Sequence, residues 1–250
     1  MIQEEQLAHW LNDSRRTVFF GGAGVSTASG IPDFRSETGL YKAQEVYGQD
    51  PEILLSHGLF RREPTLFFRY YKENLIHRAA KPNRAHLVLA EWEARGLLDT
   101  VITQNIDGLH QTAGSRRVLE LHGSNWRHYC LDCRRSYTMD YILSPEHCPD
   151  GMTPRCAQCG GVVRPDVVLY GEPLNEAVMT AAMEAVSQAD TLIVGGTSLA
   201  VYPAAGLLRY YRGKRLVLIN KTATPYDSAA RLVVHGDLGE TLAATDLNIP

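Results

Sequence analysis

Short apolar runs alternate with amphipathic stretches along most of the chain. Strand-like runs cover Val18–Phe20, Thr100–Thr103, Val118–Leu121, Val167–Leu169, Leu192–Val194 and Arg215–Ile219. Several are apolar at every position, a pattern typical of parallel strands covered by helices on both faces. The segments between them favour helices at Ile2–Asn12, Thr65–Arg78, Arg84–Arg95, Asn175–Gln188 and Ala204–Tyr211. This alternation predicts an α/β fold with an open, doubly wound, Rossmann-like parallel sheet.

Two stretches depart from this alternation. Residues 37–82 are aromatic and helical in pattern without strand signals, and residues 123–165 carry paired cysteines. Both are predicted to be insertions that together form a smaller domain, a helical insertion plus a zinc ribbon. The Rossmann-like domain would then comprise residues 1–36, 83–122 and 166–250. We expect the ligand in a cleft between the two domains.

The composition is that of an ordinary globular protein, with 250 residues of which 44% are hydrophobic and 21% charged. A net charge of -3 argues against direct nucleic-acid binding through phosphate neutralisation. The most apolar stretch, Leu192–Leu208, is interrupted by Gly195–Ser198 and by Pro203, so no membrane span is expected. The polar start at Met1–Arg16 is not a secretory signal, and a cytoplasmic location is expected.

Four of the five cysteines form two C-x-x-C pairs, Cys130 with Cys133 and Cys156 with Cys159. Two such pairs about twenty residues apart are typical of zinc ribbons, in which four thiolates complete a tetrahedral shell. A complete shell leaves no position for substrate, so the pattern predicts one structural zinc ion. Two disulfides or a redox C-x-x-C are the alternative interpretation. Cys148 fits neither pair and is interpreted as an uninvolved loop thiol.

The strand-like residues Thr17–Phe20 lead into GGAGVSTASGIPDFR at Gly21–Arg35. Glycines early in this segment let the chain turn sharply and bring bare backbone against a ligand. Strand, turn and polar segment together predict a nucleotide pyrophosphate resting on backbone N–H groups. The fingerprint G-x-G-x-x-G is incomplete, because Thr27 occupies the place of its last glycine. A tight turn without a ligand is the alternative interpretation.

Polar residues also follow the next two strands. Gln104, Asn105 and Asp107 offer donors and acceptors for ribose and carboxamide groups, although they could instead cap a helix. His122 ends the following strand and can exchange protons near neutral pH. A histidine at a strand end is more often structural, but His122 is the only plausible base among these strand ends.

Two later strands end in similar groups. Gly196, Thr197 and Ser198 form a turn with hydroxyl groups suited to phosphate or ribose, and Asn220 places an amide after the next strand. Because the carboxyl ends of parallel strands meet at one edge of a sheet, the four polar strand ends predict one shared nucleotide site.

From Thr17 to Gly239 the chain resembles the sirtuins, NAD-dependent protein lysine deacylases, in a short bacterial-type form. The resemblance rests on motifs that occur in the order of that family. They are GAGVSTASGIPDFR, TQNIDGLH, LHG, the two C-x-x-C pairs, VVLYGE, GTSLAVYPA and LIN.

The resemblance implies roles for individual residues. His122 would be the general base, with Asn105 as the second catalytic residue, and Phe34 would shield the sugar carbon from water. NAD would contact Gly22, Ala23, Gly24, Thr27, Phe34, Arg35, Gln104, Asn105, Ile106, Asp107, His122, Gly196, Thr197, Ser198, Asn220, Lys221 and Asp237. The acylated peptide would contact Val168, Tyr170, Gly171, Glu172 and Val201. Structural zinc would be bound by Cys130, Cys133, Cys156 and Cys159.

The implied activity is removal of acetyl groups from lysine in proteins or peptides, with release of nicotinamide and O-acetyl-ADP-ribose. Mono-ADP-ribosyl transfer, removal of longer neutral acyl groups and a non-enzymatic nucleotide sensor are the alternatives. Sirtuins that remove acidic acyl groups carry a Tyr-x-x-Arg pair. Here Phe67–Lys72 reads FFRYYK, with Arg69 and Lys72 aligned to the two places. The pair is absent, so a neutral acyl group is predicted.

Overall fold

The computed structural model describes residues 3–33 and 43–249. Its larger part is a six-stranded sheet in the order β3-β2-β1-β7-β8-β9, and every neighbouring pair is parallel. The strands are β1 (Thr17–Gly21), β2 (Thr100–Thr103), β3 (Val118–Glu120), β7 (Thr191–Gly195), β8 (Arg215–Asn220) and β9 (Leu232–His235). The chain reverses its direction of travel across the sheet between β1 and β7, which is the strand order of the Rossmann fold. The predicted fold class is confirmed.

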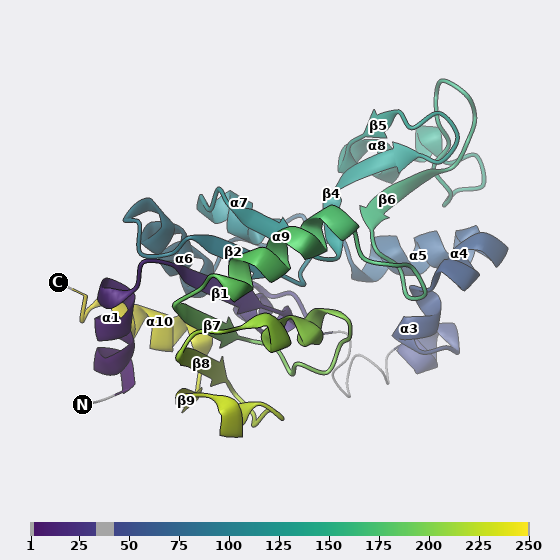
Figure 1. Cartoon of the computed structure of the whole chain (residues 1–250). Helices are drawn as coiled ribbons and strands as arrows, with labels where there is room; N and C mark the ends of the chain where they lie inside the picture. The colour runs from purple at the N-terminus through teal and green to yellow at the C-terminus, as the bar shows by residue number, and fades with distance from the viewer. Residues whose placement is uncertain (1–2, 34–42, 250) are drawn as a thin grey trace.

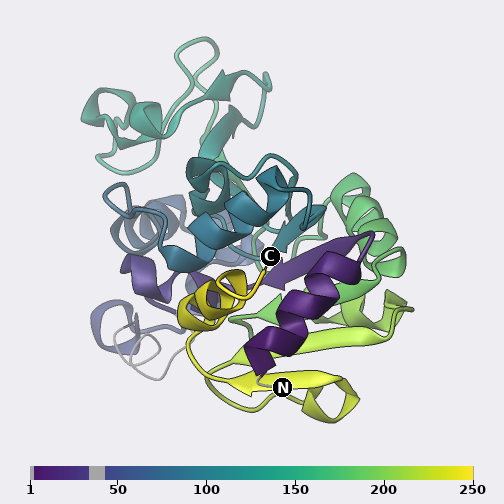
Figure 2. The ribbon, with the colours of Figure 1, turned by 90° about the vertical axis from the view of Figure 1, so that its left-hand side faces the viewer.

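Helices cover both faces of this sheet (Figure 1). One face is covered by α1 (Gln3–Asp13), α6 (Arg84–Ala94) and α10 (Leu238–Asp246), and Figure 2 shows α1 and α10 on that side. The other face is covered by α9 (Glu176–Ser187) and the 3-10 helix η4 (Ala204–Tyr210). Successive residues of β1 serve opposite faces. Phe19 packs toward α1, whereas Val18 and Phe20 pack toward α9, which explains why the strand is apolar throughout.

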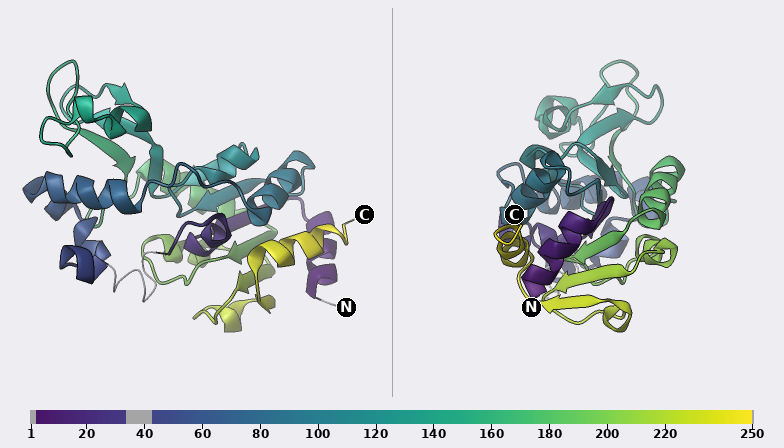
Figure 3. Two further views of the ribbon diagram at one scale, coloured as in Figure 1. Left: turned by 180° about the vertical axis from the view of Figure 1, so that it is seen from behind. Right: turned by 60° about the vertical axis from the view of Figure 1, so that its left-hand side comes forward.

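The smaller part contains a three-stranded antiparallel sheet in the order β5-β4-β6. Its strands are β4 (Gly123–Cys130), β5 (Ser136–Tyr137) and β6 (Val163–Val167). Its helices are α3 (Pro51–Leu54), α4 (His57–Arg62), α5 (Pro64–Asn74) and α8 (Met139–Leu143). Residues of α5 such as Phe67 pack in one hydrophobic cluster with Ile142 and Val163. Both chain termini lie at the end of the molecule away from this sheet (Figures 1 and 3).

Short elements elsewhere in the described residues include one further helix and four 3-10 turns. They are α7 (Leu109–Ala113), η1 (Ala23–Val25), η2 (Thr27–Ser29), η3 (Pro145–His147) and η5 (Asp227–Ala229). Among the described residues, no helix is both long enough and apolar enough to cross a bilayer. The division into two domains stays a prediction, and β6 runs across the expected boundary between residues 165 and 166.

One predicted strand is wrong. Val167–Leu169 does not belong to the parallel sheet, because Val167 ends β6 and pairs with Gly123 of β4. Three apolar residues in a row predict a strand but not the strand with which it pairs. In the structure, Val167 pairs with the antiparallel strand β4. The prediction also lacks β9, a four-residue edge strand whose last residue, His235, is exposed.

Candidate active site

A cavity of about 240 Å³ lies where the carboxyl ends of β1, β2 and β3 face the smaller part of the molecule. We call it the first cavity. Of the residues predicted to bind ligands, its lining includes Ala23, Gln104, Asn105, Ile106, Asp107, His122, Val168, Tyr170, Gly171, Glu172 and Val201. Residues that are 178 positions apart in the sequence, Ala23 and Val201, therefore border one space.

Glycines let the turn after β1 approach the turn after β7 closely. The Gly24 N–H donates to the Gly196 carbonyl oxygen at 2.8 Å. A Cβ atom on Gly24 would lie 2.8 Å from the Gly196 Cα, and one on Gly22 would lie 2.9 Å from the Thr197 Cβ. No side chain fits at either position without moving its neighbour. This close approach, more than an unusual backbone angle, explains the glycines of the turn.

Asn105 and Asp107 are held by the same hydroxyl group. Ser26 Oγ donates to Asp107 Oδ2 at 2.7 Å and accepts from Asn105 Nδ2 at 3.0 Å. Asn105 Nδ2 also donates to the Gly22 carbonyl oxygen at 3.0 Å. Asp107 Oδ1 accepts the Leu109 N–H at 2.9 Å and so satisfies the first N–H of α7, whereas the N-cap residue of that helix is Gly108. Ser26 is part of the GAGVSTASG motif, but its bridging position was not predicted.

The imidazole of His122 is oriented by the main chain. Its Nδ1 lies 2.8 Å from the Gln104 carbonyl oxygen. A carbonyl oxygen can only accept, so Nδ1 carries the hydrogen in the neutral ring and Nε2 carries the lone pair. The Val168 N–H donates to the His122 carbonyl oxygen at 2.9 Å, which places His122 beside the segment expected to bind peptide. His122 can therefore accept a proton at Nε2 without rotating its ring.

A second cavity lies along the edge of the sheet on the other side of the glycine turn. Its lining includes six predicted NAD contacts, namely Gly24, Thr27, Gly196, Asn220, Lys221 and Asp237. Lys221 Nζ lies 3.4 Å from Asp237 Oδ2, and Asp237 Oδ1 accepts the Glu240 N–H at the start of α10. Because Gly24 and Gly196 border the second cavity and Ala23 borders the first, a ligand crossing this turn can reach both.

Some predicted contacts lie elsewhere. Gly22, Thr197 and Ser198 line neither of the two cavities. Thr197 instead accepts a hydrogen bond from Gln104 Nε2 at 3.0 Å, which holds the side chain of Gln104 in place. Phe34 and Arg35 lie outside the described residues. The ligand-binding roles of the predicted residues stay predictions.

The segment from Val168 to Glu172 is fixed by a partly buried ion pair. Arg164 Nη1 and Nη2 bind the two carboxylate oxygens of Glu172 at 2.7 and 2.9 Å, and the Leu169 N–H adds a further bond at 2.9 Å. His57 Nδ1 lies 2.8 Å from Glu172 Oε1. Burial alone would raise the pKa of Glu172, but these hydrogen bonds outweigh it and lower the pKa to about 2. Glu172 is thus an anchor of the segment.

Helix α5 forms one wall of the first cavity, and none of its lining residues was predicted from the sequence. Tyr71, Asn74 and Leu75 line the cavity, a spacing that puts them on one face of the helix. The Tyr71 hydroxyl donates to Asn125 Oδ1 at 2.9 Å, and burial raises the pKa of Tyr71, which keeps it neutral. Arg69 does not line the cavity and pairs with Glu73 on the surface.

Lys72 does not line the first cavity either. Its Nζ donates to the Met152 carbonyl oxygen at 2.8 Å and to Cys148 Sγ at 3.3 Å. Among the described lining residues there is no lysine or arginine. The buried Cys148 helps to anchor Lys72 outside the cavity.

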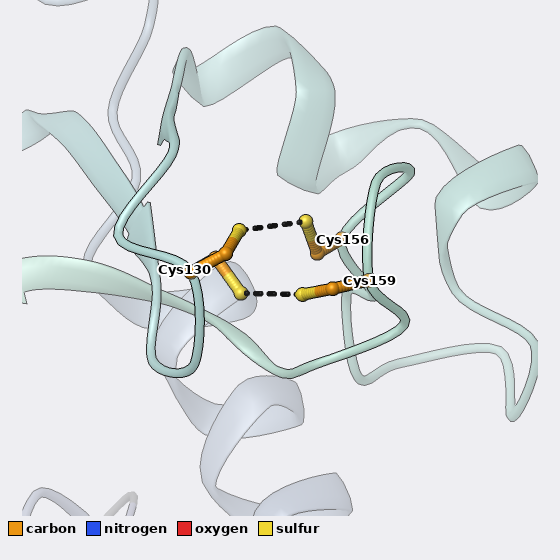
Figure 4. A group of neighbouring side chains, drawn as sticks. Cys130, Cys156 and Cys159 are labelled. Carbon is orange, nitrogen blue, oxygen red and sulfur yellow. Dashed lines mark hydrogen bonds between the residues drawn. The ribbon is translucent and has the colours of Figure 1, made fainter.

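The four paired cysteines converge at the end of β4, and Figure 4 labels three of them, Cys130, Cys156 and Cys159. Their sulfur atoms all lie within 4.8 Å of one another, with Cys130 to Cys159 at 3.4 Å and Cys133 to Cys156 at 3.6 Å. A disulfide needs about 2 Å, whereas sulfurs around a tetrahedral zinc ion lie about 3.8 Å apart. The cluster fits one structural zinc ion, as predicted, and Cys148 is not part of it.

Residues 22–203 match the Sir2 family. One relative is an NAD-dependent protein deacetylase of Clostridium acetobutylicum, 53% identical over 230 residues that cover 92% of each chain. Another, of Cutibacterium acnes, is 54% identical over 240 residues that cover 96% of each. A solved Sir2 structure with a p53 peptide and NAD+ has a TM-score of 0.84 at 40% identity, covering 97% of this chain and 96% of that chain.

A second solved structure, Sir2 bound to acetylated peptide, has a TM-score of 0.85 at 37% identity and covers 100% of both chains. Fold, strand-end residues and cysteine cluster together define a Rossmann-type nucleotide-binding protein with a zinc module. The chain belongs to the Sir2 family, the sirtuins, as its motifs predict.

Proposed function

We propose that this protein is an NAD-dependent protein lysine deacetylase, which transfers the acetyl group of a lysine to ADP-ribose and releases nicotinamide and O-acetyl-ADP-ribose. The observation that carries the proposal is the place of His122. Its imidazole lines the same cavity as Asn105 and Asp107 and borders the segment that begins at Val168. The relatives at 53% and 54% identity carry the same activity in their names.

The two cavities suit the two halves of NAD. The nicotinamide half would occupy the first cavity, where Asp107 and Asn105 offer a carboxylate and an amide held by Ser26. The adenosine half would occupy the second cavity, near Asn220 and Lys221. The pyrophosphate would cross the turn where Gly24 meets Gly196, since only bare backbone allows that approach.

NAD supplies a ribose carbon that becomes reactive when nicotinamide leaves. His122 then acts as the general base, because its Nε2 lone pair can take the proton of a ribose hydroxyl while Nδ1 stays bound to the Gln104 carbonyl. Val168, Tyr170 and Val201 are apolar or aromatic neighbours that would hold the acylated lysine and exclude water. Water exclusion matters because early access of water would hydrolyse NAD without deacetylation.

We also propose that the substrates are acetylated lysines in proteins or peptides and that the enzyme acts in the cytoplasm. Four thiolates bind zinc only while they remain reduced, which favours a reducing compartment. The net charge of -3 supports a protein that binds neither nucleic acid nor membranes directly.

The decisive experiment uses NAD labelled in the adenine ring. It measures both the nicotinamide released and the product that carries the label. Release that needs an acetylated peptide, with the label recovered in O-acetyl-ADP-ribose, supports the proposal. The unacetylated form of the same peptide is the control. Label that stays on protein would indicate mono-ADP-ribosyl transfer instead, and release that ignores the peptide would refute deacetylation.

A further inference from the structure

Strand β4 is interrupted by a bulge near its start. Ser124 of β4 pairs with Asp166 of β6, and the next pair is His128 with Pro165, so residues 125–127 are inserted between two neighbouring pairs. We call residues 125–127 the bulge. Bulges of this kind redirect side chains and are common beside active sites. The side chains of the bulge are therefore placed to contact other elements.

The bulge holds two consecutive carbonyl groups of the loop after β2. The Asn125 N–H donates to the Ile106 carbonyl oxygen at 2.9 Å. Trp126 Nε1 donates to the Asp107 carbonyl oxygen at 2.7 Å. Ile106 and Asp107 both line the first cavity. The smaller part of the molecule therefore fixes the main chain of a loop whose side chains form the site.

The indole of Trp126 also covers the next residue of that loop, Gly108. Gly108 has a φ of +74°, and a Cβ atom there would lie 2.6 Å from both Cδ1 and Nε1 of the indole. Only glycine allows the ring to approach the main chain this closely. Trp126 is nevertheless 49% exposed, so its contact with the loop explains its position better than hydrophobic burial does.

These contacts complete the support of Asp107. Its carboxylate is held by Ser26 Oγ at Oδ2 and by the Leu109 N–H at Oδ1, and its carbonyl oxygen is held by Trp126. Glycine at position 108 resists rotation less than any other residue, so the carbonyl contact is what fixes the peptide plane between Asp107 and Gly108. Rotation of this plane would carry the Leu109 N–H away from Oδ1 and release the carboxylate.

We propose that Trp126 is a positioning residue, which fixes the Asp107 carboxylate for the nicotinamide end of NAD from outside the cavity. This inference rests on the proposed function, in which that end of NAD lies beside Asp107. Trp126 does not line the first cavity, so it acts through the loop and not by touching the ligand. The peptide segment has its own anchor in Arg164 and Glu172, so loss of the indole should affect NAD more than the peptide.

The test compares the binding of NAD with the binding of ADP-ribose by calorimetry. ADP-ribose lacks nicotinamide, so its affinity does not depend on how Asp107 meets the carboxamide. For Trp126→Ala we expect the Kd of NAD to rise about threefold to tenfold, the usual range for one lost hydrogen bond. The Kd of ADP-ribose should change by less than about twofold. Equal weakening of both ligands would overturn the proposal, because it would indicate a general disturbance of the site.

Steady-state kinetics give a second measurement. We expect the KM for NAD to rise in Trp126→Ala, while the KM for acetylated peptide stays unchanged. Trp126→Phe keeps an aromatic ring over Gly108 and removes only the N–H donor. Its Kd for NAD should therefore lie between that of the unmodified enzyme and that of Trp126→Ala. A KM that rises only for the peptide would contradict the role of Trp126.

Arg127→Gln is the matched control. Arg127 is the next residue of the bulge and is also exposed, but its ion pairs are with Glu120 and Asp166 instead of the loop after β2. The ratio of the Kd of NAD to the Kd of ADP-ribose should not change in this variant. A rise as large as in Trp126→Ala would show that the bulge as a whole, and not the indole, supports the site, and would overturn the proposal.

Trp126 is half exposed, so Trp126→Ala should fold, and circular dichroism and zinc content check this. If it unfolds, Trp126→Phe takes its place, and an unchanged ratio of the two Kd values in that variant overturns the proposal. If the unmodified enzyme shows no acetyl-dependent nicotinamide release, the proposed function fails. The Kd values of NAD and ADP-ribose need no turnover, so they still decide on Trp126.

Discussion

Nδ1 of His122 lies 2.8 Å from the main-chain carbonyl oxygen of Gln104, two positions before Ile106 in the loop after β2. This contact sets the tautomer of the imidazole and leaves Nε2 as the proton acceptor. The loop that supplies the carbonyl also supplies Asn105 and Asp107 to the cavity. One loop therefore orients the base and lines the pocket in which the base would act.

We expect His122→Ala to lower deacetylation by a factor of about 10² to 10⁴, the usual contribution of a general base. Folding and NAD binding should be largely retained. His122 is partly exposed, so water can hydrogen-bond to the Gln104 carbonyl oxygen after the imidazole is removed. Nicotinamide release and calorimetric NAD binding are the measurements, with exposed His9→Ala as the control. Near-normal turnover of the variant would show that another group is the base.

Arg164 is expected to be important for the peptide side of the site. Arg164→Met leaves the Glu172 carboxylate partly buried without its bidentate partner, and loss of one member of such a pair costs about 3–5 kcal/mol. We expect the KM for acetylated peptide to rise more than the KM for NAD, since the segment at Leu169 loses its anchor. Exposed Arg61→Met on α4 is the control. Equal changes in both KM values would contradict this role.

The same ion pair predicts acid sensitivity in a defined window. The pKa of Glu172 is lowered from 4.5 to about 2 in the folded protein, so the unfolded chain takes up its proton first as pH falls. The stabilisation is fully present above pH 4.5 and is lost between that value and about 2. The measurement is the free energy of unfolding in urea between pH 4.5 and 2, for the unmodified protein and for Arg164→Met. If this free energy depends on pH in the same way in both proteins, the prediction is wrong.

The sequence predicted those parts of the site that follow from local patterns. Polar residues at strand ends, such as Asn105 and His122, can be found because the carboxyl ends of parallel strands share an edge. Cysteine spacing likewise predicts the zinc cluster. Tyr71 and Asn125 could not be found in this way. They are 54 positions apart, and only the packing of α5 against β4 joins them.

The placement of Arg69 and Lys72 shows the same limit. Both are cations on α5, but the helix turns Arg69 toward Glu73 and Lys72 toward the Met152 carbonyl, while Tyr71 faces the cavity. Successive helical positions differ by about 100° in direction, so an alignment that is off by one residue exchanges a wall residue for a surface one. Only the structure resolves that choice.

Buried histidines should make the fold acid-labile at higher pH than the Glu172 pair does. Both ring nitrogens of His110 are buried without a hydrogen-bond partner among the described residues, and its ring packs against Phe19 and His86. Burial lowers the pKa of His110 to about 3, and burial, opposed by Asp107, lowers the pKa of His86 to about 4. The unfolded chain thus binds these protons first, near pH 6.5.

Stability is therefore expected to be highest above pH 6.5 and to fall as the pH drops toward 4, by up to about 1.4 kcal/mol per pH unit for each histidine. His110→Phe keeps a ring of similar size and removes one titrating group, so its stability should fall less steeply over this range. Urea unfolding at pH 7.5, 6, 5 and 4 is the measurement. The exposed His9 on α1 supplies the control variant His9→Phe. An unchanged slope in His110→Phe would contradict the assignment.

The zinc cluster should determine the stability of the smaller part without taking part in chemistry. Cys156→Ala removes one of four thiolates, and we expect loss of bound zinc, a lower melting temperature and poor solubility, because metal binding supplies folding free energy to such modules. Cys148→Ala is the matched control, since Cys148 is a buried cysteine of the same region outside the cluster and should leave one zinc ion per chain. Zinc content by atomic absorption and thermal unfolding with and without a chelator are the measurements. A metal-free protein with unchanged melting temperature and full activity would show that the four sulfurs need no metal.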